Sequence, residues 1–179
     1  MTEAIHSRPR KFARTGFLQY VGRKERRLIL PWFGALGLGL SGRKLYDIYF
    51  SPELQLETAL NLDRRFHADF VNIMDDGIIC SETLGARLLH PDHDFPSVLE
   101  PLVEAPRDLA ARNIPRPDRD GRMPLNLESL KLLAETSEKP VVISVEGPFT
   151  LAGQLMGVQD LARNIIRAPD FIRDLLEFT

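Results

Sequence analysis

A run of β-branched residues that leads directly into a Gly-Pro turn constrains the fold of this chain most strongly. Residues 141–145 read Val-Val-Ile-Ser-Val, and Gly147-Pro148 follows after a single glutamate. Continuous apolar runs of this length are typical of strands that are covered on both faces in a parallel sheet. Residues 28–33 and 68–74 form similar runs, and helical patterns lie between the runs. This alternation predicts an α/β fold with parallel strands and flanking helices.

The best helix start lies at Ser51-Pro52-Glu53. It combines an N-cap, a proline suited to the first helical position and an acid at the positive end of the helix dipole. Residues 105–124 are rich in Pro, Arg and Asp, so we expect an exposed connection with one short helical piece. Helices are predicted over residues 17–27, 52–66, 127–135 and 158–165, and from Pro169 to the end of the sequence.

The length of the chain limits how much of a barrel it can form. A closed (β/α)8 barrel takes about 250 residues, and the 179 residues here supply about half of one. We expect a partial barrel over residues 17–179, truncated at its C-terminus, that either pairs with itself or belongs to a longer protein. Residues 1–16 are interpreted as a solvated basic tail, with a nucleic-acid-type basic arm and an organellar presequence as alternatives.

The charge, hydrophobicity and cysteine content of the chain indicate which kinds of partner and which compartment suit it. The net charge of −2 gives no overall attraction to nucleic acid or to an anionic membrane. The longest uncharged apolar run, residues 28–40, is shorter than the roughly 20 residues that span a bilayer. The single cysteine excludes an intramolecular disulfide and suits a reducing compartment. We therefore expect a cytoplasmic protein that binds neither nucleic acid nor membrane.

Three clusters follow the predicted strands, at the strand ends where parallel α/β folds bind ligands. They are the flexible glycine-rich loop 34–42, the pair Asp75-Asp76, and residues 146–150. Adjacent residues that leave a strand point to opposite sides, so at most one aspartate aims into a central site. Such a carboxylate can orient a donor or stabilise a cationic intermediate, but Asp-Gly is also common in turns.

Other polar residues give weaker signals. Residues 90–94, His-Pro-Asp-His-Asp, contain metal-ligand types, but these crowd into one loop, and a polar surface loop is the preferred interpretation. No metal site is predicted. Cys80 follows two isoleucines and is interpreted as a small buried hydrophobe. Thr150 and Gln154 are expected to line a pocket just past the Gly-Pro turn.

Residues 145–157, Val-Glu-Gly-Pro-Phe-Thr-Leu-Ala-Gly-Gln-Leu-Met-Gly, resemble a signature of the uroporphyrinogen decarboxylase superfamily. A second match runs from Asp75-Asp76-Gly77 to Glu82-Thr83-Leu84-Gly85. The resemblance implies the N-terminal half of a (β/α)8 TIM-like barrel with Asp76 as the substrate-facing catalytic residue. The candidate substrate-binding residues are Gly37, Gly39, Asp75, Gly147, Pro148, Phe149, Thr150 and Gln154.

Departures from the family pattern indicate the branch. Decarboxylases of this family carry an Arg-Gln-Ala-Gly-Arg segment whose arginines pair with tetrapyrrole carboxylates, whereas residues 34–38 here are uncharged. The superfamily also contains corrinoid-dependent methyltransferases, and the segment 147–157 resembles that branch. In that branch the zinc ligands, a His-x-Cys pair and a later Cys, belong to the second half of the barrel. The resemblance therefore implies zinc and a corrinoid protein for the full-length protein, and no cofactor in this chain.

Three functional hypotheses follow. The leading one is a methyltransferase-like protein, inactive as an isolated fragment, that moves methyl groups between a cobalamin protein and a thiol or similar acceptor. The second is a carboxy-lyase that uses Asp76 without a metal. The third is a non-catalytic half-barrel that binds a ligand or a partner. The expected partners are a small-molecule substrate or a corrinoid protein, with a second copy or a missing C-terminal half to complete the barrel.

Overall fold

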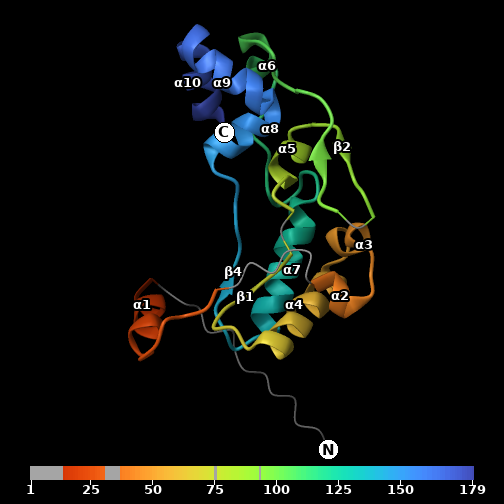
Figure 1. Cartoon of the computed structure of the whole chain (residues 1–179), viewed down its shortest axis with the longest axis vertical. Coiled ribbons are helices and arrows are strands. Elements are labelled where there is room, and N and C mark those ends of the chain that lie inside the picture. Colours follow the sequence, from red (N-terminus) through yellow and green to blue (C-terminus); the bar gives the residue numbers. More distant parts are fainter. Residues whose placement is uncertain (1–13, 31–36, 75, 93) are drawn as a thin grey trace, which may run out of the picture.

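Two groups of elements lie toward opposite ends of the long axis of the molecule (Figure 1). The computed structural model describes residues 14–30, 37–74, 76–92 and 94–179. The parallel strands lie in one group and the C-terminal helices in the other. The helices are α1 (Arg14–Gly22), α2 (Leu38–Ser41), α3 (Leu45–Tyr49), α4 (Pro52–Phe66), α5 (Ile79–Thr83), α6 (Pro106–Ala110), α7 (Met123–Thr136), α8 (Pro148–Met156), α9 (Val158–Arg167) and α10 (Pro169–Phe178), and the strands are β1 (Val71–Asn72), β2 (Leu88–Leu89), β3 (Ser97–Val98) and β4 (Val141–Val142).

The first group is built on the parallel pair β1 and β4. Val71 is in register with Val141, and Asn72 with Val142. Helices α4 and α7 pack against each other beside this pair, and Ala59, Ile73 and Leu133 join Val71 in a buried core. Parallel strands with flanking helices are therefore present, and the predicted α/β class is confirmed.

Local signals at the start of α4 act as the sequence predicts. The Ser51 hydroxyl accepts a hydrogen bond from the Leu54 amide at 3.2 Å, and Pro52 opens the helix. The helix ends at Phe66, where His67 adopts a left-handed conformation with φ of 51°. The predicted helix over residues 52–66 is therefore confirmed to the residue.

The other predicted helices are confirmed with shifted ends. The helix predicted over 127–135 lies within α7, that over 158–165 lies within α9, and α10 begins at Pro169. The helix predicted over 17–27 runs instead from Arg14 to Gly22. The short piece expected in the connection 105–124 is α6.

The strands are much shorter than predicted. Each of β1 and β4 has two residues, and Leu28–Leu30 forms no strand, while the rest of the run 28–33 lies outside the described residues. The prediction that these runs are covered on both faces is also wrong for residues near their ends. Ile29 is 56% exposed and Val145 is 74% exposed. Ile29 exchanges hydrogen bonds with Asp69 alone, so no ladder extends along this segment.

In the second group α8, α9 and α10 pack against one another, and α10 packs against α6 (Figure 1). Leu109, Leu155, Leu161, Phe171 and Leu175 belong to its buried core. Helix α8 begins at the Gly-Pro turn itself, since Gly147 is its N-cap and Pro148 takes the first helical position. Within the described residues, no helix has both the length and the hydrophobicity required to cross a membrane.

Candidate functional site

Asp76 lies just past the C-terminal end of β1, in the loop that leads to α5. Its side chain is 1% exposed. One carboxylate oxygen, Oδ2, accepts from Nη2 of Arg122 at 2.5 Å, and the other, Oδ1, accepts from the Ile78 amide at 3.2 Å. Both oxygens of this carboxylate therefore already have protein partners.

Arg122 is the centre of an ionic cluster that we call the Arg122 cluster, made of the buried Asp76 and Arg122 and the partly buried Glu82. Nε of Arg122 donates to Glu82 Oε2 at 2.5 Å, and the Arg122 guanidinium lies 5.1 Å from the Phe50 ring centroid. Burial alone would lower the pKa of Arg122, but the charges and hydrogen bonds of the two carboxylates outweigh burial and raise its pKa. The guanidinium is therefore a permanent cation that holds both acids.

A glycine turn positions Arg122 directly before α7. Gly121 has φ of +56°, and a Cβ there would lie 2.5 Å from Oγ1 of Thr83 in α5. A side chain at this position would be both strained and in collision with α5. The turn therefore lets the start of α7 approach α5 closely enough for Arg122 to reach both carboxylates.

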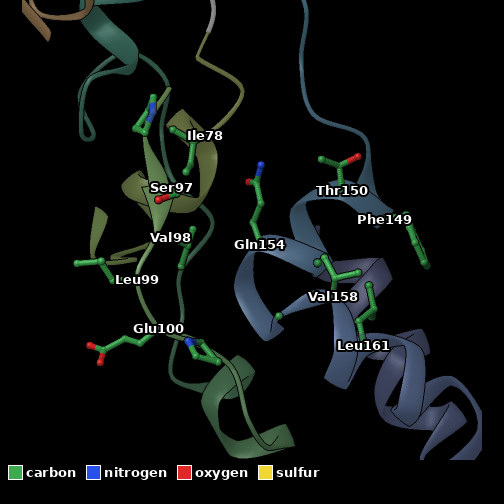
Figure 2. Close-up of a pocket in the computed structure, with 14 residues that line it drawn as sticks. Ile78, Ser97, Val98, Leu99, Glu100, Phe149, Thr150, Gln154, Val158 and Leu161 are labelled. Atoms are coloured by element: carbon green, nitrogen blue, oxygen red, sulfur yellow. The ribbon is translucent and has the colours of Figure 1, made fainter. Parts of the chain in front are cut away.

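A pocket of about 620 Å³ opens next to this loop, between the β2–β3 hairpin with its following segment and the helices α8 and α9 (Figure 2). Pockets of this size are typical of small-molecule sites. Its apolar walls include Ile78, Val98, Leu99, Phe149, Val158 and Leu161, and its polar side chains are those of Ser97, Glu100, Thr150 and Gln154. The peptide amides of Leu102 and Val103 donate to the Leu155 carbonyl at 2.7 and 3.0 Å, which ties the two walls together.

Gln154 connects the pocket to the Asp76 loop. Its Nε2 donates to the Gly77 carbonyl at 2.5 Å, and Figure 2 shows its side chain between the two walls. A carbonyl can only accept, so the amide nitrogen must face Gly77. Because Ile78 lines the pocket and its amide binds Asp76, one short loop borders the Arg122 cluster on one side and the pocket on the other.

The uroporphyrinogen decarboxylase (URO-D) family matches this chain over residues 39–179. The chain belongs to the uroporphyrinogen decarboxylase family. The match includes every element from α3 to α10, so the Arg122 cluster and the pocket both lie inside the URO-D region. The resemblance predicted from the two sequence motifs is confirmed.

Solved structures support the fold of this URO-D chain. A methyltransferase from Methanosarcina mazei matches with a TM-score of 0.75 and 22% sequence identity, over 89% of this chain and 49% of the methyltransferase. The chain thus spans about half the length of that methyltransferase. At this identity the likeness shows a shared fold. The comparison with curated proteins gave no match.

The structure brings together some of the predicted site residues. Phe149, Thr150 and Gln154 line the pocket, whereas Gly147 and Pro148 start α8 outside its lining. Asp76 is in the Arg122 cluster and does not line the pocket. Asp75 lies outside the described residues. The site assignments themselves stay predictions.

The glycine-rich loop differs from its prediction. Leu38–Ser41 forms α2, so the part of segment 34–42 that the structure describes is largely helical, and residues 34–36 lie outside the described part. A Cβ on Gly37 would lie 2.4 Å from Thr58 Cγ2, so this glycine is required for packing against α4. Gly39 is exposed to open space, and neither glycine lines the pocket.

Sequence reasoning missed the buried cation. The connection 105–124 was expected to be exposed, but Arg122 is 5% exposed, which makes that expectation wrong at this residue. Glu82 was quoted only as part of the URO-D motif. The signal that could have found Arg122 is the pair of acids in that motif, because buried carboxylates require a cation or hydrogen-bond donors.

Glu146, between β4 and α8, is a second acid that sequence reasoning left without a role. Neither of its carboxylate oxygens has accessible surface or a hydrogen-bond partner among the described residues. A buried acceptor that forms no hydrogen bond destabilises the fold. This side chain is therefore a local weak point at the end of β4.

The described residues do not fit the zinc site of the methyltransferase branch. They contain no cluster of three or more His, Cys, Asp or Glu suited to a metal ion. Cys80 was predicted to be a small buried hydrophobe; it packs against the core of the C-terminal helices but is only partly buried. In the loop 90–94, Asp92 binds Lys44 at 2.7 Å and His90 packs on the Tyr46 and Phe50 rings, while His93 lies outside the described residues.

Proposed function

We propose that this chain supplies the substrate-binding half of a corrinoid-linked methyltransferase of the URO-D family. In the whole enzyme a methyl group would pass between a cobalamin protein and a thiol or similar acceptor. The chain alone would bind substrate without turnover. The observation that carries the proposal is that, among the described residues, no Arg or Lys lines the pocket at the signature helix α8.

The character of the pocket supports a methyltransferase more than a decarboxylase. A uroporphyrinogen carries eight carboxylates, and proteins bind such groups with arginine forks. The nearby buried arginine, Arg122, is already held by Asp76 and Glu82. The described lining therefore lacks the cations that a polyanionic tetrapyrrole requires.

The position of Asp76 also weighs against the carboxy-lyase hypothesis. A carboxylate that acts on substrate must reach it within hydrogen-bond distance. Here the Asp76 side chain is 1% exposed, is held by Arg122 and the Ile78 amide, and does not line the pocket. We propose that Asp76 instead fixes the loop that forms one edge of the pocket.

The residues of this chain would perform the binding part of the reaction. The apolar side chains of the hairpin and of α8 and α9 would exclude water around the reacting group. Gln154 would hold the Gly77 carbonyl and so keep the loop in place beside the substrate. No step is assigned to zinc, because the donor set described above does not fit it.

The proposal is tested with a chimaera. We would fuse residues 1–179 to the portion of the Methanosarcina mazei methyltransferase that this chain does not cover. Methylcobalamin absorbance with 2-mercaptoethanol reports methyl transfer, and CO2 release from uroporphyrinogen reports decarboxylation. We expect methylcobalamin consumption by the chimaera and none by the isolated chain.

A chimaera variant with Thr150→Trp, which fills the pocket, should lose this activity. Decarboxylation without methyl transfer would support the carboxy-lyase instead. A folded chimaera with neither activity would support the non-catalytic half-barrel. The corrinoid-protein partner, self-association or completion by a C-terminal half, and the cytoplasmic location stay predictions of the sequence.

A further inference from the structure

We infer that the pocket between the β2–β3 hairpin and α8 takes an uncharged, mostly apolar small molecule and discriminates against anions. This inference rests on the proposed function, which places the substrate in the same pocket. It adds the chemical class of that substrate, which neither the family nor the fold assigns.

The charges around the pocket carry the inference. Of the described residues that line the pocket, Glu100 is the one with a charged side chain. It pairs with Arg87 at 2.9 Å, and Arg87 is 72% exposed and outside the lining. An anion that entered would lose hydration and would find the Glu100–Arg87 ion pair instead of an unpaired cation. An uncharged molecule has neither penalty.

The apolar side chains lie on both walls. Figure 2 shows Val98 and Leu99 on the hairpin side and Phe149, Val158 and Leu161 on the helical side. Phe149 is 58% exposed and Val158 is 72% exposed, so these surfaces are available to a ligand. Burial of apolar surface is the main source of affinity that such walls can offer.

Polar groups in the pocket suit a neutral ligand. Ser97 on the hairpin and Thr150 on α8 are exposed residues of the pocket lining. A hydroxyl can both donate and accept, so it binds neutral groups without a charge. The N-terminal end of α8 attracts negative charge, whereas the Glu100 carboxylate repels it. Because these two effects oppose each other, the test measures whether the pocket prefers a neutral ligand to an anion.

Gln154 keeps the pocket formed before a ligand arrives. Its hydrogen bond to the Gly77 carbonyl joins α8 to the loop that carries Ile78. The amides of Leu102 and Val103, bound to Leu155, join the far end of the hairpin segment to the same helix. A pre-formed apolar pocket loses little conformational entropy on binding.

The test compares two probes with the purified full chain. Indole is neutral, and indole-3-acetate adds a carboxylate to the same ring. Binding is followed by saturation-transfer NMR and by calorimetry. We expect indole to bind several-fold more tightly than indole-3-acetate. Thr150→Arg, which adds a cation at an exposed pocket position, should reverse that order.

A matched control is Gln159→Arg, which adds the same charge at an exposed position of α9 outside the pocket lining and should leave the order unchanged. Equal or tighter binding of indole-3-acetate by the natural chain would overturn the inference and leave the pocket as a substrate site. Binding of neither probe, or binding that Thr150→Trp does not abolish, would overturn both the inference and the placement of substrate in this pocket.

Discussion

Arg122 shows how one side chain can decide the stability of the site region. Replacement by methionine would leave the Asp76 and Glu82 carboxylates without their cation in a buried place. Removal of one partner from a buried ion pair costs about 3–5 kcal/mol. We expect Arg122→Met to lower the free energy of unfolding by that amount in urea titrations.

The control for this prediction is Arg119→Met. Arg119 also pairs with an acid, Asp120 at 3.4 Å, but its side chain is 64% exposed. Exposed pairs contribute about 0–1 kcal/mol, so this variant should unfold almost like the natural chain. Equal losses in the two variants would show that the Arg122 cluster does not stabilise the fold.

Glu146 gives the opposite prediction. Its carboxylate is buried without a partner among the described residues, so an apolar side chain of similar length should fit better. Removal of an unsatisfied buried polar group is worth about 1–3 kcal/mol. We expect Glu146→Met to raise the urea midpoint. A fall in the midpoint would mean that the carboxylate has a partner in the folded protein.

At the residue scale, the sequence predicted what local motifs determine. Phe149, Thr150 and Gln154 follow a Gly-Pro turn, and their place at a strand end already indicated a pocket. Arg122 could not be placed in the same way. Its burial depends on the approach of α5 to the start of α7, which a linear pattern does not contain.

Among the elements, α8 offers a test of helix propensity within the pocket wall. A Cβ on Gly153 would meet Val158 Cγ2 at 3.6 Å and Leu161 Cδ2 at 3.7 Å, which are ordinary contacts. Alanine is about 1 kcal/mol better than glycine in a helix interior. We expect Gly153→Ala to stabilise the chain by about 0.5–1 kcal/mol in urea titrations.

Gly157, at the end of the same helix, is the contrasting position. Its φ is +86°, where a side chain is strained even though a Cβ would have room. Gly157→Ala should therefore destabilise the chain. A gain in stability there, or a loss at Gly153, would contradict the helix geometry of α8.

The segment after α1 is anchored through Asp69. Arg26 donates to both oxygens of this carboxylate at 2.8 Å, and the Tyr20 hydroxyl donates to the Asp69 carbonyl at 2.9 Å. The hydrogen bond from Arg26 and that from the Ile29 amide hold the pKa of Asp69 below its ordinary value. The charged form of Asp69 is therefore favoured more strongly in the folded state than in the unfolded state, so ionisation of Asp69 stabilises the fold.

The sign of this effect fixes its pH dependence. The stabilisation is fully present above the unfolded pKa of about 3.9 and is lost as the pH falls through the lower folded value. Asp69→Asn should expose the segment around Arg26 to proteolysis at pH 7. The difference from the natural chain should shrink in the acid range. A difference that grows in acid would contradict the anchor.

At the element scale, helices could be predicted with their approximate bounds, whereas β1 and β4 could be predicted in position but not in length. The start of α4 is set by Ser51, Pro52 and Glu53, all within one helical turn. A strand needs neighbours, and β4 pairs with β1 along two residues only. Residues beyond that pairing, such as Val145, are of types that favour strands but lie outside β4.

For the whole molecule, family membership rests on the match over residues 39–179, and the chain covers about half of a methyltransferase with a similar fold. The parallel pair β1 and β4 and the long helices α4 and α7 agree with part of a larger α/β fold. Completion of a barrel by another chain or by a further segment stays a prediction. The proposed function does not require that completion to be known, because it is based on the pocket beside α8.

The central claim is that this URO-D chain binds a small substrate and not a tetrapyrrole polyanion. Titration of the full chain with uroporphyrin, an aromatic octacarboxylate, tests it most directly by fluorescence of the porphyrin. We predict no saturable binding at micromolar concentrations, because no Arg or Lys lines the pocket in the part of the chain that the structure describes. Stoichiometric binding that Thr150→Trp abolishes would contradict the account.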